Sequence, residues 1–142
     1  MEDSVFTKII KGQIPCHKLY EDDQTIVFVP LHPVALGHVL AVPKRQVDQF
    51  FDLPQADYRA LMATVKMMAS HMKTVLGTKR VGLKVEGLDV PHAHVHILAF
   101  DTNEQFNQKP DESQPVDRAK LAALAAKLRL PEDNLTVEND HV

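Results

Sequence analysis

At 142 residues the chain has the length of one globular domain, which excludes a mini-protein held together by disulfides. Apolar residues make up 44% of the sequence and charged residues 25%. The apolar runs are too short for a membrane span, and the N-terminus lacks the basic segment followed by an apolar segment that is typical of a secretory signal. We therefore expect a cytoplasmic protein. The net charge of −3 disfavours nucleic acid as a partner but not a small anionic ligand. The single cysteine, Cys16, excludes an internal disulfide and a multi-cysteine zinc site.

The first half of the chain predicts a short helix, three strands and one long helix. In chain order these are a helix within residues 1–11, strands at 18–20, 25–29 and 38–42, and a helix at 53–76. Gly12 and Gly77 follow the two helices as stop signals, and Pro54 suits the first turn of the second helix. The apolar stripe of the long helix therefore predicts a face that packs in the core or against a second copy.

The second half predicts a hairpin and a C-terminal helix. Strands are expected at residues 81–85 and 92–100, joined by a turn at 86–89, and a polar segment follows at 102–114. A helix at about 115–130 begins near Pro115 and carries Leu121, Leu124 and Leu128 on one face. Because no βαβ alternation or linker is present, we predict one α+β domain over residues 1–142 on an antiparallel sheet of about five strands.

Three of the eight histidines, His92, His94 and His96, alternate within the last predicted strand. Side chains two apart on a strand share a face and lie ~6.8 Å apart, so the three imidazoles are expected to form a row of ~13.5 Å. The alternate residues Ala93, Val95 and Ile97 are apolar and are expected to face the core. This spacing predicts an imidazole-lined face on a rigid support.

Three interpretations of the row compete. The histidines could be solvated or hydrogen-bonded structural residues, or two of them could share a zinc ion, although the motif contains no neighbouring carboxylate ligand. The third interpretation is a phosphate site, in which one imidazole attacks phosphorus and others donate to its oxygens or to the leaving group. Neighbouring imidazoles favour the neutral form that a nucleophile needs, because a proton on one disfavours a proton on the next.

The segment His92-Ala-His94-Val-His96-Ile-Leu resembles the signature of the histidine triad family, in which three histidines alternate with apolar residues. The resemblance extends upstream to the segments around His38 and at 6–15, and it runs in order from about Ser4 to Phe100. It implies an α+β fold of the histidine triad type with a core at about 4–100, usually a homodimer. It also implies hydrolysis of phosphoramidate or phosphoanhydride bonds at the α-phosphate of a purine nucleotide, with no metal or other cofactor.

The resemblance also implies roles for individual residues. His94 corresponds to the nucleophile that forms a nucleotidyl-histidine intermediate, His96 to the contact with the phosphate and leaving group, and His92 and His38 to supporting residues. Four apolar residues correspond to the walls of the base and ribose pocket, and plain core packing is the alternative for the first three: Phe6, Ile9, Phe28 and Leu31. Asp89 stands where a phosphate-contacting hydroxyl is common.

The chain departs from the family pattern at several positions. Pro30 stands where an aspartate that binds the ribose is common, Val85 where an asparagine is common, and Leu88 where a glutamine is common. Some members bind a structural zinc through Cys-x-x-Cys and a histidine; the matching positions here are Ser4, Thr7 and Gln46, so that zinc site is expected to be absent.

These departures leave three functions open. They are a nucleoside phosphoramidase or related nucleotide hydrolase, a dinucleoside polyphosphate hydrolase with the same nucleophile, and a nucleotide-binding module with little catalysis. The last is motivated by Pro30, Val85 and Asp89, because a proline offers no side-chain hydrogen bond and a carboxylate repels phosphate.

Overall fold

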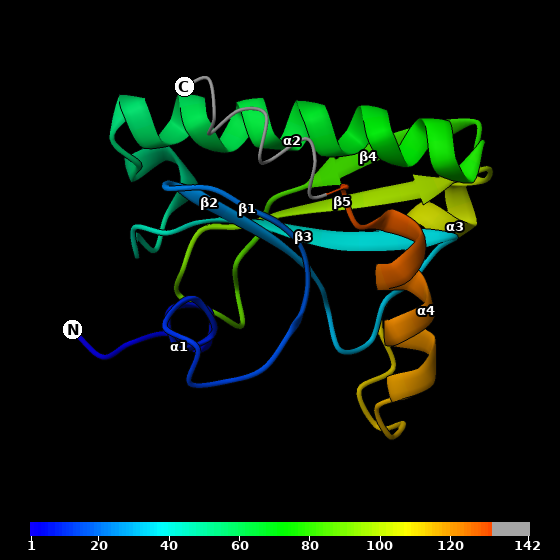
Figure 1. The fold of residues 1–142 in the computed structure, drawn as a ribbon, viewed down its shortest axis with the longest axis horizontal. Helices are drawn as coiled ribbons and strands as arrows, with labels where there is room; N and C mark the ends of the chain where they lie inside the picture. The colour runs from blue at the N-terminus through cyan, green and yellow to red at the C-terminus, as the bar shows by residue number, and fades with distance from the viewer. Residues whose placement is uncertain (132–142) are drawn as a thin grey trace.

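A five-stranded sheet forms the centre of the fold in the computed structural model, which describes residues 1–131 (Figure 1). The strands are β1 (His17–Glu21), β2 (Thr25–Val29), β3 (Gly37–Pro43), β4 (Arg80–Lys84) and β5 (Val95–Phe100). Their spatial order is β1-β2-β3-β5-β4, and every neighbouring pair is antiparallel. The predicted α+β class with an antiparallel sheet is therefore confirmed.

The helices lie on both faces and at one end of this sheet. The long helix α2 (Gln55–Leu76), which follows the 3-10 helix η1 (Phe50–Asp52), covers one face, whereas the short helix α1 (Val5–Ile10) lies on the other side (Figure 1). Helix α3 (Asn103–Asn107) contacts β5, and α4 (Arg118–Leu128) packs against β1, β2 and α2. None of the helices within residues 1–131 is long and apolar enough to cross a membrane.

Strands β2 and β3 each contribute to two separate cores, because successive side chains of a strand point to opposite faces. In β3, Val39 and Ala41 lie in the main core with α2, whereas Leu40 and Val42 lie in a second cluster with Phe6 of α1. The second cluster therefore fixes α1 against the sheet, on the face opposite to α2.

The last strand is shorter than the sequence predicts, because β5 begins at Val95 and not at His92. The backbone N–H of His92 donates to the carbonyl of Val90 at 2.8 Å, and that of Ala93 donates to the carbonyl of Val47 at 2.7 Å. These residues therefore bond to loops and make no ladder with β3. The prediction of a tight hairpin turn at 86–89 is wrong for the same reason, since the connection from β4 to β5 spans residues 85–94.

Helix α3 lies in the segment for which we predicted only polar chain. Thr102 caps it, and Thr102 and Gln105 form a reciprocal capping box, a pattern that the sequence contains as Thr-x-x-Gln. Phe106 of this helix packs over Gly82 of β4, where an added Cβ would lie 2.6 Å from the Phe106 ring. A side chain at position 82 would therefore displace the Phe106 ring that packs α3 against the sheet.

Candidate functional site

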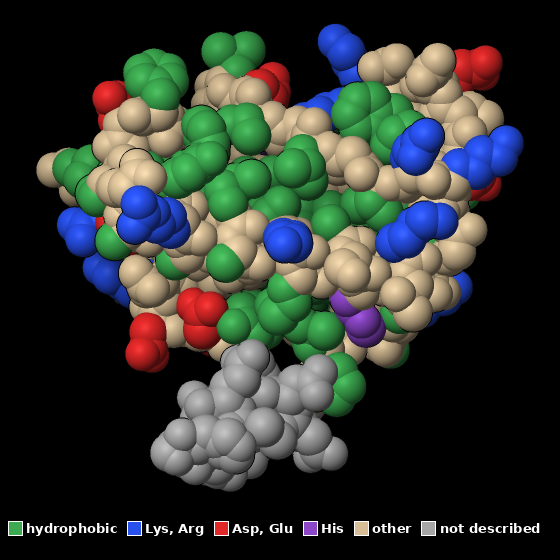
Figure 2. Space-filling model, turned by 90° about the horizontal axis from the view of Figure 1, so that it is seen from above, with side chains coloured by type: hydrophobic (Ala, Val, Ile, Leu, Met, Phe, Trp, Pro, Cys, Tyr) green, Lys and Arg blue, Asp and Glu red, His purple; other side chains and the backbone are tan. Residues whose placement is uncertain are grey.

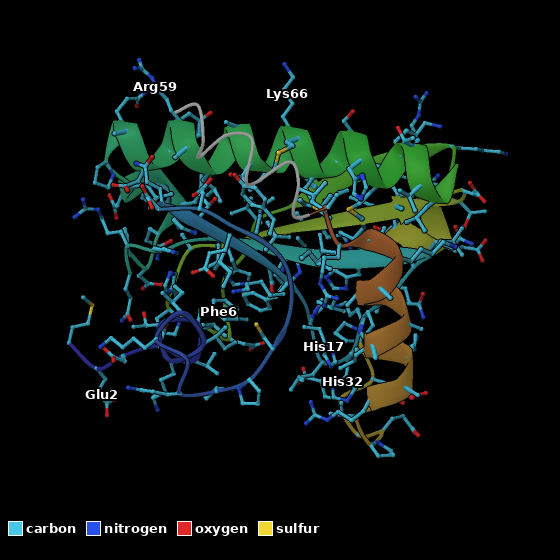
Figure 3. All side chains as sticks on the ribbon, in the orientation of Figure 1. Glu2, Phe6, His17, His32, Arg59 and Lys66 are labelled. Carbon is cyan, nitrogen blue, oxygen red and sulfur yellow. The ribbon has the colours of Figure 1, made fainter. Side chains whose placement is uncertain are left out.

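Four histidines from three segments converge on the face of the sheet that carries α1. His38 lies on β3, His96 on β5, and His92 and His94 on the 85–94 loop. The ring centroids are 5.2 Å apart for His38 and His96 and 5.0 Å apart for His94 and His96. Phe6, on the side of α1 toward the sheet (Figure 3), packs edge-on against His94 with a centroid distance of 4.9 Å. The structure thus brings together all four histidines that we predicted from the sequence.

His38 and His96 form a hydrogen-bonded pair with defined proton positions. The backbone N–H of Val34 donates to His38 Nδ1 at 3.2 Å, so the proton of a neutral His38 is on Nε2. This Nε2 then donates to His96 Nδ1, 2.9 Å away. The proton of a neutral His96 is therefore on its own Nε2.

His92 and His94 have defined proton positions for the same kind of reason. His92 Nε2 lies 2.7 Å from the carbonyl oxygen of Pro43 and must donate to it, so Nδ1 accepts from the Ser4 hydroxyl at 2.7 Å. His94 Nδ1 lies 2.8 Å from the carbonyl oxygen of His92 and donates to it. A neutral His94 therefore presents an unprotonated Nε2.

The Nε2 atoms of His94 and His96 are the two that remain free. Neither has a hydrogen-bond partner among residues 1–131, and no buried side-chain nitrogen or oxygen in that part of the chain lacks one. Both atoms must therefore reach the solvent, although His94 as a residue is only 6% exposed. The site presents a lone pair on one ring beside an N–H donor on the next, an arrangement that is suited to attack on a phosphoryl group.

All four imidazoles have lowered pKa values. Burial, followed by the neighbouring His96 and Lys84, lowers the pKa of His38 to about 3. Burial, followed by His94 and Lys84, lowers the pKa of His96 to about 4. Burial is also the main cause that lowers the pKa values of His92 and His94. The neutral forms assumed above therefore dominate at neutral pH.

Two charged residues act on the cluster that sequence reasoning did not place in the site. Lys84 lies directly opposite His96 in the β4–β5 register, and its ammonium donates to the carbonyl of Phe106 and lies 4.6 Å from the centroid of the Phe106 ring. Glu86 is the carboxylate whose charge raises the pKa of His94, against the larger effect of burial. Lys84 comes close to the histidines through the β4–β5 register, and Glu86 through the 85–94 loop. The predicted strands contained neither this register nor this loop.

The other sequence-predicted site residues differ in their environment. Phe6 and Phe28 are buried side by side in the second core cluster, with ring centroids 5.6 Å apart, and Ile9 packs against that cluster. Leu31 is 52% exposed, and Asp89 is exposed on the 85–94 loop. Phe6 thus lies against His92 and His94 with Phe28 packed on its other neighbours in the second core cluster, whereas Leu31 and Asp89 border solvent.

The three positions that match the family's zinc ligands form a hydrogen-bonded group here. The Gln46 amide oxygen accepts from the backbone N–H of Ser4 at 2.8 Å and from the Thr7 hydroxyl at 2.6 Å. Within residues 1–131, no group of three or more His, Cys, Asp or Glu side chains is arranged to hold a metal ion.

Comparison with known proteins shows the family to which the chain is similar. The HIT domain model matches residues 11–103. An uncharacterized HIT-like protein of Methanocaldococcus jannaschii is 33% identical over 66% of this chain and 76% of its own length. Adenylylsulfatase HINT3 of Arabidopsis thaliana is 32% identical over 68% of this chain and 51% of its own length.

A solved structure supports the fold independently of close sequence similarity. A HIT-like protein involved in cell-cycle regulation from Bartonella henselae superposes with a TM-score of 0.76, covering 89% of this chain and 94% of that chain at 23% identity. The family model, the relatives and the shared fold agree with the alternating histidines of the site. The chain therefore belongs to the histidine triad (HIT) family of nucleotide-binding proteins.

Proposed function

We propose that the protein is a hydrolase that cleaves phosphoramidate or phosphoanhydride bonds at the α-phosphate of a purine nucleotide. The observation that carries the proposal is the pair of free Nε2 atoms, unprotonated on His94 and protonated on His96. A neutral imidazole lone pair is a nucleophile, and an adjacent N–H can stabilise the charge that develops on the phosphate or leaving group. Adenylylsulfatase HINT3, the relative from Arabidopsis, has a named activity on an adenylyl compound.

The proposed reaction has two displacements at the same phosphorus. In the first, His94 Nε2 attacks the α-phosphorus, a P–N bond to His94 forms, and the bond to the amine or phosphate leaving group breaks, with the departing atom facing the His96 N–H. In the second, water attacks the nucleotidyl-histidine, the P–N bond breaks, and nucleoside monophosphate leaves with regeneration of neutral His94. His38 holds His96 in its donor tautomer, and the His92 carbonyl holds His94.

The nucleoside part of the substrate is proposed to bind beside α1. Phe6 and Phe28 supply the buried aromatic floor, and Ile9 and the exposed Leu31 supply the walls. Asp89 is proposed to lie near the phosphates, and Lys84 and Glu86 set the charge around the histidines. Cys16 is a free cysteine, which fits our proposal of a cytoplasmic location.

The reaction is tested by offering the purified protein adenosine 5′-phosphoramidate, adenylyl sulfate and a diadenosine polyphosphate separately. We expect AMP as product from at least one of them and, after rapid acid-free quenching, an increase in intact protein mass equal to one adenylyl group. Binding by calorimetry without AMP or adduct over hours would instead support a nucleotide-binding module with little catalysis. The choice among the three substrates separates a phosphoramidase from a dinucleoside polyphosphate hydrolase.

We also propose that two copies associate through α2 and β4. Strand β4 is an edge of the sheet, and its Leu83 lies opposite the core residue Ile97, is 42% exposed and faces the α2 side. Figure 2 shows hydrophobic side chains gathered over the face that α2 forms, and Arg59 and Lys66 project from its outer side (Figure 3). A second copy would pair with the free edge of β4 and cover this apolar surface.

Light scattering at micromolar concentration is expected to give twice the mass of one chain. Leu83→Lys should shift the mass toward that of one chain, because it places a charge within the proposed contact, whereas Lys8→Glu, at an exposed position on α1 on the opposite face of the sheet, should not. A single-chain mass for the unmodified protein contradicts the dimer.

A further inference from the structure

His94, the nucleophile of the proposed reaction, lies on the 85–94 loop and not on a strand. Strand β5 begins only at Val95, so neither His92 nor His94 has the ladder hydrogen bonds that position His96. Yet His92 is fully buried and His94 is 6% exposed. Their positions must therefore depend on contacts other than the sheet.

Those contacts come from α1. The Ser4 hydroxyl caps α1 by accepting from the backbone N–H of Thr7 at 3.0 Å, and it donates its own proton to His92 Nδ1 at 2.7 Å. The Thr7 hydroxyl is 3.4 Å from the same nitrogen but is committed to Gln46 at 2.6 Å. His92 Nδ1 thus accepts its hydrogen bond from the Ser4 hydroxyl.

Gln46 holds Ser4 and Thr7 in this arrangement. Its amide oxygen accepts from the Ser4 backbone and the Thr7 hydroxyl, and its amide nitrogen donates to the carbonyl of Glu2 at 2.8 Å. Gln46 touches no histidine in these contacts, and it lies just beyond the end of β3 at Pro43, so it ties α1 to the sheet. The N-terminal segment, the end of β3 and His92 therefore form one connected hydrogen-bond network.

We propose that Ser4 is a positioning residue for the nucleophile, acting through His92. With Ser4 donating to Nδ1 and Pro43 accepting from Nε2, the His92 ring has one tautomer and one orientation. The carbonyl of the same residue accepts from His94 Nδ1 and thereby directs the lone pair of His94 Nε2 toward the open side of the site. The expected effect of Ser4 on catalysis rests on the proposed function, whereas the tautomer of His92 is independent of that function.

Kinetics of Ser4→Ala and Ser4→Thr test the catalytic consequence. Ser4→Ala removes the donor, and we expect kcat to fall by about 10- to 100-fold with KM changed less than about twofold, because a small misplacement affects the transition state more than binding. Ser4→Thr keeps a hydroxyl and should restore most of kcat. The matched control is Asp117→Ala, which removes the N-cap of α4 far from the histidines and should leave kcat unchanged. Unchanged kcat in Ser4→Ala overturns the inference.

Nitrogen NMR of the unmodified protein tests the tautomer without any substrate. Histidine labelled with 15N should show His92 protonated at Nε2 and unprotonated at Nδ1, and Ser4→Ala should broaden or shift the Nδ1 signal while Asp117→Ala does not. A proton on His92 Nδ1 in the unmodified protein overturns the inference. If the tautomer is as stated but no nucleotide adduct forms on the unmodified protein, the proposed function fails and the network stands.

Discussion

Replacing His94 by alanine is expected to abolish turnover and the nucleotidyl adduct, lowering the rate by about 10⁴-fold or more. The reason is that His94 carries the free unprotonated Nε2, whereas every ring nitrogen of His38, His92 and His96 is either hydrogen-bonded or protonated. The measurements are AMP release under single-turnover conditions and intact protein mass after quenching.

The control for this variant is His17→Ala, which removes an imidazole from β1, outside the site, and should keep the parent rate. The fold should survive in His94→Ala, because the main core beneath α2 does not contain this side chain. A circular dichroism spectrum equal to that of the parent protein confirms this. Parent activity in His94→Ala would show that another group is the nucleophile.

The sequence predicts the scaffold of the site better than its detailed geometry. The long helix, the first three strands and the core positions of Ala93, Val95 and Ile97 agree with the structure, because apolar periodicity reports directly which face of an element is buried. Periodicity also led to the wrong prediction that the last strand begins at His92. His92 and His94 are buried by loop contacts, and the resulting alternation of residues looks the same in the sequence as that of a strand. The expected row on one straight strand is therefore replaced by a cluster from a loop and two strands.

Contacts between distant segments could not be derived from local patterns. The bond from His38 to His96 joins residues 58 positions apart, and the bond from Ser4 to His92 joins residues 88 positions apart. Ser4 was visible in the sequence only as a position matching a zinc ligand, and Lys84 only as a residue within the strand predicted at 81–85. Their relation to the histidines depends on the order β3-β5-β4 and on where α1 docks, which are properties of the tertiary fold.

Acidification below pH 6.5 is expected to destabilise the protein through its buried neutral histidines. The pKa of His38 is about 3 in the folded protein, and an unfolded histidine has a pKa of about 6.5, so below pH 6.5 the unfolded chain binds a proton that the folded chain does not. The contribution of His38 is fully present above pH 6.5 and is lost as pH falls toward 3, with a slope of about 1.4 kcal/mol per pH unit. His92, His94 and His96, whose pKa values are also lowered, act in the same direction.

Urea unfolding between pH 7.5 and 5 should show this fall in the free energy of unfolding, and His38→Gln, whose side chain cannot be protonated, should show a shallower fall. Parallel stability curves for the two proteins would contradict a neutral buried His38.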